Sequence, residues 1–327
     1  MKYLYIAVVV LFFVFSPDAS AFLNEPGDSC KKVQTREVAI TFDDLPTNST
    51  RHDIRSQREL TENLLLRINA NNIPAVGFVN EDKLYDDTVF NKQRVELLEK
   101  WLSAGLELGN HTFSHKSLNQ IPLLQYEEDV IKGEKTVSKL LSNHGMKLRY
   151  FRHPFLQTGR SIAVKDSFEN FLSARGYTVA PVTIDNSDWI FARAYDNARD
   201  RGDIEMMDKI VKAYIPYMQS KFEYYENQSV KLFGREISQV LLVHANTINS
   251  EHFDKIAEML KARGYKFVSL KEALSDSAYK SPDTFIKAGG ISWLHRWAIT
   301  KGMTREFFKG EPLTPEFVMK EAGVEEE

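Results

Sequence analysis

Two adjacent carboxylates and two histidines spaced four apart are the residues of this sequence best suited to chemistry. Asp43 and Asp44 follow the apolar run Val38–Phe42, and His111 and His115 follow another apolar run. Successive strand side chains point in opposite directions, so one aspartate can bind a cation while the other stays free as a base. Two histidines and one carboxylate leave an open position for water, as catalytic zinc sites do. Taken singly, the aspartates also fit a turn, and the histidines fit an ordinary surface helix.

Three further segments place a charged or titratable group at the end of an apolar run. They are Tyr150-Phe151-Arg152-His153-Pro154-Phe155, Ile184-Asp185-Asn186-Ser187-Asp188-Trp189 and Val240-Leu241-Leu242-Val243-His244-Ala245-Asn246. Folds built on parallel strands gather their functional side chains at the carboxyl ends of those strands. We therefore expect the five segments to meet at one edge of a sheet.

Short apolar runs alternate with longer amphipathic stretches from Glu37 onward. The runs predict strands at Val38–Phe42, Ala75–Val79, Glu107–Gly109, Tyr150–Arg152, Thr178–Ile184, Val240–Val243 and Phe267–Leu270. Helical spacing of apolar residues predicts helices over 56–69, 94–104, 124–141, 167–175 and 252–263. The alternation indicates an α/β fold with a mainly parallel sheet, closed or nearly closed into a barrel, without a second domain.

The five segments, in this order, resemble the polysaccharide deacetylases of carbohydrate esterase family 4, the NodB-homology family. The resemblance rests on Thr41-Phe42-Asp43-Asp44, His111-Thr112-Phe113-Ser114-His115, Arg152-His153-Pro154-Phe155, Asp185-Asn186-Ser187-Asp188-Trp189 and Leu242-Val243-His244. It covers roughly Glu37 to Leu274 and implies a distorted (β/α)7-type barrel as the single catalytic domain. His153 stands where the family often has proline. We expect it to be a surface residue or a group near the metal, with substrate contact as the third option.

The resemblance also implies a role for each site residue. Asp44, His111 and His115 would bind the metal, Asp43 would be the general base, and Arg152 would hold Asp43 ionised. His244 would be the general acid and Asp188 would orient it. The substrate pocket would include Asp185, Trp189, Leu242 and the backbone N–H of Phe155, which would stabilise the oxyanion.

This assignment is chemically coherent. Amide hydrolysis needs an activated water, a polarised carbonyl and a proton for the leaving nitrogen, and bound zinc supplies the first two. Separate acid and base residues supply the proton transfers. Zinc suits these ligands, although cobalt or nickel fits the same donor set.

The resemblance and the site chemistry together imply removal of N-acetyl groups from a GlcNAc-containing polysaccharide, peptidoglycan or chitin-like. The alternatives are an O-deacetylase of another glycan such as xylan, and a barrel that binds glycan without catalysis. The net charge of −3 gives no strongly basic face, so nucleic acid is not an expected partner. The sequence gives no indication of oligomeric state.

Residues 1–21 are typical of a secretory signal peptide. Met1-Lys2 is a short positive start, Tyr3 to Phe15 is apolar, and Ala19-Ser20-Ala21 is a cleavage signal. We expect cleavage near Ala21-Phe22, a secreted or periplasmic protein, and no membrane span after cleavage. Cys30 is the only cysteine, so no internal disulfide can form.

The expected organisation of the mature chain has three parts. A flexible N-terminus covers residues 22–36, and the barrel covers residues 37–275. Within the barrel, a helical excursion packs over about residues 193–239. A helical extension covers residues 276–327.

Overall fold

The structure is a computed structural model that describes Met1 and residues 36–327. The predicted signal peptide, its cleavage site and Cys30 lie outside these residues. The sheet contains the strands β1 (Arg36–Leu45), β2 (Val76–Val79), β5 (Glu107–Asn110), β6 (Tyr150–Phe151), β7 (Thr178–Val179), β8 (Gln239–His244) and β9 (Tyr265–Phe267). A separate hairpin joins β3 (Tyr85–Asp86) to β4 (Val89–Phe90).

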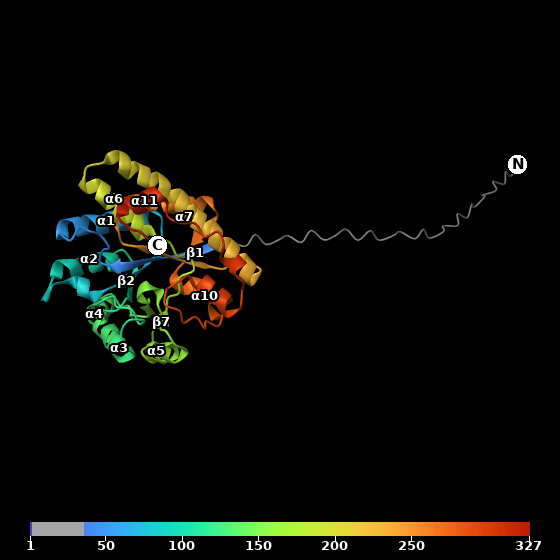
Figure 1. The fold of residues 1–327 in the computed structure, drawn as a ribbon, viewed down its shortest axis with the longest axis horizontal. Coiled ribbons are helices and arrows are strands. Elements are labelled where there is room, and N and C mark those ends of the chain that lie inside the picture. The colour runs from blue at the N-terminus through green and yellow to red at the C-terminus, as the bar shows by residue number, and fades with distance from the viewer. Residues whose placement is uncertain (2–35) are drawn as a thin grey trace. The chain divides into compact units, whose positions relative to one another are not determined.

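Helices surround this sheet, as Figure 1 shows. They are α1 (Ile54–Ala70), α2 (Lys92–Ser103), α3 (Leu123–Lys132), α4 (Lys135–Asn143), α5 (Ile162–Ala174), α6 (Asp188–Asp200), α7 (Ile204–Phe233), α8 (Thr247–Ala262), α9 (Leu270–Ala273), α10 (Trp293–Thr300) and α11 (Glu316–Ala322). Short 3-10 turns occupy Glu81–Leu84, Pro154–Leu156, Ser277–Lys280 and Arg305–Phe308. No helix of the described chain is long and apolar enough to cross a bilayer.

All strands of the large sheet run parallel, in the order β7-β6-β5-β2-β1-β8, and β9 also pairs with β1. The chain after β7 crosses to the other end of this order, where Ile184 forms a parallel bridge with Leu241. The sheet therefore curls into a distorted barrel, which confirms the predicted fold class.

The alternation of side chains along β1 separates the barrel interior from its helical coat. Ala39, with Val76, Tyr150 and Val240 of other strands, belongs to the interior apolar cluster. Val38, Ile40 and Phe42 instead pack with the surrounding helices in the main core. Because side chains alternate with a period of two, Thr41 and Asp43 share the face of Ala39 and point to the interior.

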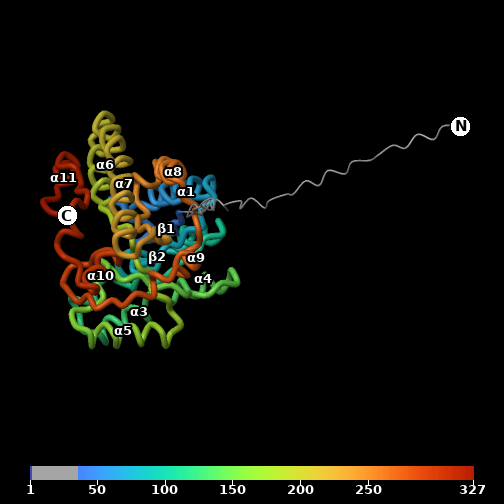
Figure 2. The backbone as a smooth tube through the Cα atoms, turned by 90° about the vertical axis from the view of Figure 1, so that its right-hand side faces the viewer, coloured from blue at the N-terminus to red at the C-terminus, as the bar shows by residue number. Residues whose placement is uncertain are grey.

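The helical excursion expected over about residues 193–239 corresponds to most of α6, which begins at Asp188, and to α7. The aromatic stripe of α7, including Tyr214 and Tyr225, is buried in the main core. In Figure 2, α6, α7 and α11 lie together on one side of the barrel, and α6 contacts both α7 and α11.

Three local predictions need correction. The helix expected over 124–141 is broken into α3 and α4 at Gly133, where an added Cβ would lie 2.5 Å from the backbone of Thr112 and of Phe113. The strand expected at 267–270 ends at Phe267, because Ser269 and Glu272 form a capping box that begins α9. The ladder of β7 ends at Val179, and the rest of the expected strand becomes the crossing segment.

Candidate active site

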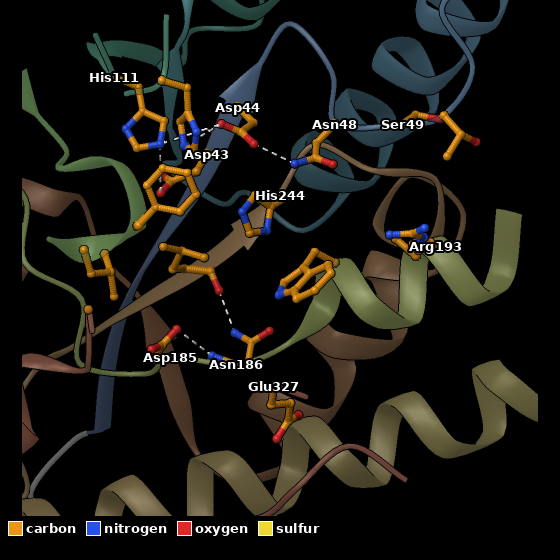
Figure 3. A pocket seen from close by; sticks show the side chains of 18 of the residues that line it. Asp43, Asp44, Asn48, Ser49, His111, Asp185, Asn186, Arg193, His244 and Glu327 are labelled. Carbon is orange, nitrogen blue, oxygen red and sulfur yellow. Dashed lines mark hydrogen bonds and ion pairs between the residues drawn. The ribbon is translucent and has the colours of Figure 1, made fainter. Parts of the chain in front are cut away.

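The five motif segments meet at the carboxyl end of the barrel, around one cleft of about 870 Å³. The predicted site residues that line it are Asp43, Asp44, His111, His115, Phe155, Asp185, Trp189, Leu242 and His244. Arg152 and Asp188 are fully buried behind this wall. Figure 3 shows Asp43, Asp44, His111 and His244 at one end of the cleft and Arg193, on α6, farther along it. His52 also lines the cleft, in line with the rim position that its closeness to Asp44 in the sequence allows.

Asp44, His111 and His115 form the one group of described residues whose donor atoms suit a metal ion, with all three atoms within 4.8 Å of one another. The Nε2 atoms of His111 and His115 lie 3.7 and 3.4 Å from Oδ1 of Asp44. That Oδ1 atom is buried and has no hydrogen-bond partner among residues 36–327. A buried carboxylate oxygen without a donor is costly, and a cation between these three groups would satisfy it. The donor set therefore fits a zinc-type ion.

The backbone at the three candidate ligands is shaped for this convergence. Asp44 and His115 have φ values of 67° and 52°, in the left-handed region that non-glycine residues rarely adopt. The Thr112 hydroxyl accepts a hydrogen bond from the His115 N–H at 3.0 Å, and this contact holds the turn between the two histidines. Strained residues of this kind persist where surrounding contacts fix them, and they cluster at functional sites.

Hydrogen bonds orient the candidate ligands. Nδ1 of His111 lies 2.8 Å from the Arg152 carbonyl oxygen, so Nδ1 carries the proton and Nε2 faces Asp44 with its lone pair. Asn48 donates to Oδ2 of Asp44 at 2.6 Å. The Lys83 ammonium lies 3.7 Å from the same oxygen and donates to the Asp44 carbonyl at 3.0 Å.

The charge states of these three groups favour a cation. Burial raises the pKa of Asp44, but Lys83 and the nearby histidines lower it more, and the net effect is a pKa well below the usual range. Burial lowers the pKa of both His111 and His115 to about 4. At neutral pH the site therefore presents one carboxylate and two neutral imidazoles, which are the ligand forms that bind metal.

Asp43 lies beside the triad, on the interior face of β1. Its Oδ2 is 3.7 Å from Nε2 of His111 and 3.5 Å from Nη1 of Arg152. Burial raises the pKa of Asp43 and Arg152 opposes this rise without cancelling it. Arg152 thus favours the ionised form of Asp43, while burial sets the net direction of the pKa shift.

Arg152 is itself held in place by the barrel interior. Its Nη2 donates to the Thr41 hydroxyl at 2.9 Å, and Thr41 in turn donates to the Leu241 carbonyl at 2.7 Å. The guanidinium also lies 4.7 Å from the ring centre of Phe78. These contacts fix the cation under Asp43.

His244 and Asp188 form a second charged pair on the opposite wall. Nδ1 of His244 lies 2.7 Å from Oδ1 of Asp188. The other carboxylate oxygen accepts hydrogen bonds at 2.8 Å from the His244 N–H and from the side chains of Asn246 and Asn249. Burial lowers the pKa of His244, but Asp188 raises it more, to a net value of about 9. His244 therefore carries a proton at neutral pH, and its Nε2 is free of Asp188.

The loop after Arg152 places Phe155 at the cleft. Phe155 is 54% exposed, and its ring meets the His115 ring edge to face with centroids 4.5 Å apart. Its N–H has no acceptor within the described part of the chain. His153 is buried against the rings of Phe151 and Phe168, so the expected surface position is wrong, while a place near the metal stays a prediction.

Sequence reasoning missed several residues that support the site. Asn48, Asn246 and Asn249 follow the motif strands by only a few positions, so their nearness was a usable signal. Thr41 stood in the first motif but was given no role, and Lys83 carried no signal, since only the folded chain brings Lys83 to Asp44.

A barrel of parallel strands thus carries a candidate metal-ligand triad and a separate histidine–aspartate pair at its carboxyl end. Residues 31–180 match the sequence profile of the polysaccharide deacetylases. The peptidoglycan-N-acetylglucosamine deacetylase of Bacillus cereus is 22% identical over 156 residues, which make up 47% of this chain and 46% of that protein. The chain therefore spans less than half the length of this curated relative.

Two solved structures show similar folds at low identity. The peptidoglycan deacetylase PdaC from Bacillus subtilis is 20% identical, with a TM-score of 0.46 over 74% of this chain and 93% of that chain. BA3943, described as a carbohydrate esterase family 4 pseudoenzyme from Bacillus anthracis, is 14% identical, with a TM-score of 0.48 over 74% and 66%. Residues 31–180 therefore carry a polysaccharide deacetylase domain, which confirms the resemblance for the three motifs that lie in this range.

Proposed function

We propose that the protein is a metal-dependent hydrolase that removes N-acetyl groups from a GlcNAc-containing polysaccharide, peptidoglycan or chitin-like. The observation that carries this proposal is the meeting, in one cleft, of a donor triad with an unsatisfied carboxylate oxygen, an adjacent second carboxylate and a protonated histidine. These are the groups that amide hydrolysis requires.

Asp44, His111 and His115 would hold the metal, and zinc suits a set of one carboxylate and two imidazoles. When bound, the metal lowers the pKa of a water molecule and polarises the acetyl carbonyl. The Asp44 oxygen without a donor and the His111 tautomer fixed by the Arg152 carbonyl both support this ligand set.

Asp43 would act as the general base, taking a proton from the attacking water. Its ionised form would be favoured by the Arg152 guanidinium, 3.5 Å away, together with the charge of the metal. Its Oδ1 atom has no hydrogen-bond partner among residues 36–327, so a lone pair remains for the proton.

His244 would act as the general acid, giving its proton to the leaving nitrogen. Asp188 holds Nδ1, so Nε2 is the atom left to donate, and a pKa near 9 keeps the proton in place until the nitrogen needs it. The Phe155 N–H would donate to the oxyanion that forms on the acetyl carbonyl. Asp185, Trp189 and Leu242 would contact the substrate from the cleft wall.

Acetate release tests this proposal. The zinc-loaded protein is incubated with peptidoglycan, chitooligosaccharides and acetylated xylan, and acetate is measured with and without a chelator. Release from the first two that the chelator abolishes supports the proposal. Release from xylan alone favours O-deacetylation, and no release from any substrate favours a glycan-binding barrel.

Two variants test the roles. Asp43→Asn and His244→Ala should each lower kcat by about 10²- to 10⁴-fold, the usual contribution of one acid or base group. Bound zinc, measured by elemental analysis, should stay near one ion per chain. Wild-type rates in either variant contradict the role of that residue.

The pattern of residues 1–21 and the polymers named above lead us to propose that the protein acts outside the cytoplasm. N-terminal sequencing of the protein exported by its host would begin near Phe22 if this is right, and would show an intact Met1-Lys2 start if it is wrong.

A further inference from the structure

The turn that carries Phe155 has an unusual backbone. Phe155 and Leu156 have φ values of 56° and 53°, two successive non-glycine residues in the left-handed region. Such residues are strained, and they persist only when neighbouring structure fixes them. The turn ends at Gly159, whose N–H donates to the Asn119 side chain at 3.0 Å.

The contacts that fix this turn come from residues 283–296, which lie far along the chain and outside the part that the family profile matches. Arg296, on α10, is fully buried. Its Nη1 donates to the Leu156 carbonyl at 3.2 Å, and its Nη2 donates to the Thr158 hydroxyl. A buried guanidinium thus holds the turn at two points.

The Arg296 side chain is in turn held by its surroundings. Its Nε donates to Asp283 at 2.8 Å, and the same carboxylate lies 2.7 Å from the Lys165 ammonium. The guanidinium lies 4.4 and 5.1 Å from the ring centres of Trp293 and Phe285. The contact to the turn is therefore rigid, because a guanidinium paired on all sides has few alternative positions.

Gly290 packs closely against the same turn and also lines the cleft. An added Cβ there would lie 1.7 Å from the Phe155 carbonyl oxygen and 3.0 Å from the Leu156 carbonyl carbon. Its φ is not positive, so glycine is required at this position by the close approach alone. Gly289 also lacks a positive φ, and a Cβ there would meet nothing within 4 Å.

Residues 283–296 are anchored to the barrel wall. The Ser292 hydroxyl donates to the Thr183 carbonyl at 2.8 Å, and the Trp293 N–H donates to the Val182 carbonyl at 2.7 Å. Asn119 donates to the Ala288 carbonyl at 2.9 Å and, as noted above, accepts from Gly159. The segment is thus fixed on both sides of the turn it contacts.

We propose that Gly290 and Arg296, from the segment 283–296, are positioning residues for the Phe155–Leu156 turn of the active site. They hold the turn so that the Phe155 N–H reaches the cleft beside His115. The catalytic unit then extends past the barrel into the C-terminal segment. This inference rests on the proposed function for its catalytic consequence, and on the contacts above for the geometry.

The adjacent glycines provide the test. Gly290→Ala and its matched control Gly289→Ala are made in the full-length, zinc-loaded protein. Gly290→Ala should lower kcat on chitooligosaccharides by about 10- to 100-fold, because loss of one oxyanion donor costs up to about 10³-fold. KM and bound zinc should stay within about twofold of wild type, and Gly289→Ala should match wild type throughout. A wild-type kcat in Gly290→Ala overturns the inference that the position of this turn matters for catalysis.

Amide hydrogen exchange gives a readout that does not depend on turnover. The peptide containing residues 154–159 should exchange about 10-fold faster in Gly290→Ala than in Gly289→Ala, because the turn loses its fixed position. Exchange at the Gly289→Ala rate means that the segment does not hold the turn. If the wild type releases no acetate, the proposed function fails. The exchange rates of Gly290→Ala and Gly289→Ala then still show whether the segment holds the turn.

Arg296→Lys covers the case in which Gly290→Ala does not fold. Lysine can still pair with Asp283 but lacks the guanidinium fork that reaches Leu156 and Thr158. Faster exchange of residues 154–159 and a lower kcat, with zinc still bound, support the inference. Wild-type values for both exchange and kcat contradict it.

Discussion

Replacement of Asp188 by asparagine should move the alkaline limit of activity. Asp188 raises the pKa of His244 to about 9 against the lowering effect of burial, whereas an unperturbed histidine has a pKa of 6.5. These values correspond to a difference in proton affinity of roughly 300-fold. Asp188→Asn keeps the shape of the side chain and removes the largest of the charges that raise the pKa of His244, so this pKa should fall towards 6.5.

The direction in which activity changes with pH follows from the role of His244 as an acid. A raised pKa keeps the protonated form present up to about pH 9, and the form is lost as the pH rises through that value. At pH 8 about 90% of His244 is protonated when its pKa is 9, and about 3% when it is 6.5. Activity at pH 8 should therefore fall by up to about 30-fold in Asp188→Asn, and the loss should be smaller at pH 6.

The assay is acetate release from chitooligosaccharides between pH 6 and 10, with bound zinc and thermal stability measured at each end. Tyr214→Phe serves as the control, because it removes a hydrogen bond to Asn249 in the same network without changing charge. Its alkaline limit should stay near that of wild type. An unchanged alkaline limit in Asp188→Asn would refute the reasoning that Asp188 sets the proton affinity of His244.

Other predictions concern the metal and the barrel interior. Chelation should abolish acetate release and added zinc or cobalt should restore it; activity that survives complete zinc removal contradicts a metal role. Asn48→Ala removes the hydrogen bond to Asp44 and should weaken zinc binding about 10- to 100-fold in a competition titration, with near-normal kcat at saturating zinc. Thr41→Val leaves Nη2 of Arg152 without its acceptor and should lower the free energy of unfolding by about 1–3 kcal/mol in urea titrations. Thr61→Val is its control, because the buried Thr61 hydroxyl has no partner in the described chain. This variant should lower the free energy of unfolding by less.

The sequence predicted the architecture well because strand patterns depend on local alternation of apolar residues. It placed β1, β2 and β8 within a few residues, since their side chains are buried on both faces. It did less well where a distant contact decides the local structure. A side chain at Gly133, where α3 ends, would meet the Thr112–Phe113 backbone, and no local pattern carries that information. The capping box at Ser269 was present in the sequence and would have corrected the strand expected there.

The site residues also divide into those that a local pattern predicts and those that depend on distant contacts. The motif residues could be named because each follows an apolar run, and the structure gathers them around one cleft. The burial of His153 depends on Phe168, which comes from a helix that does not belong to any motif. The contacts from Arg296 and Gly290 depend on a segment more than 100 residues away in sequence, so they could not be predicted from the motif itself.

The central position of β1 has a consequence for how the chain folds. β1 pairs with β2, but its other partners are β8 and β9, and Val38 lies opposite Gln239 across about 200 residues of chain. At synthesis rates of roughly 5–20 residues per second, β1 waits roughly 10–40 s for β8 to appear. During that time its apolar segment Val38–Phe42 presents an unpaired edge, which is a hazard for aggregation. A fragment cut at residue 180 keeps this edge permanently, so the matched region 31–180 should not fold as an independent unit.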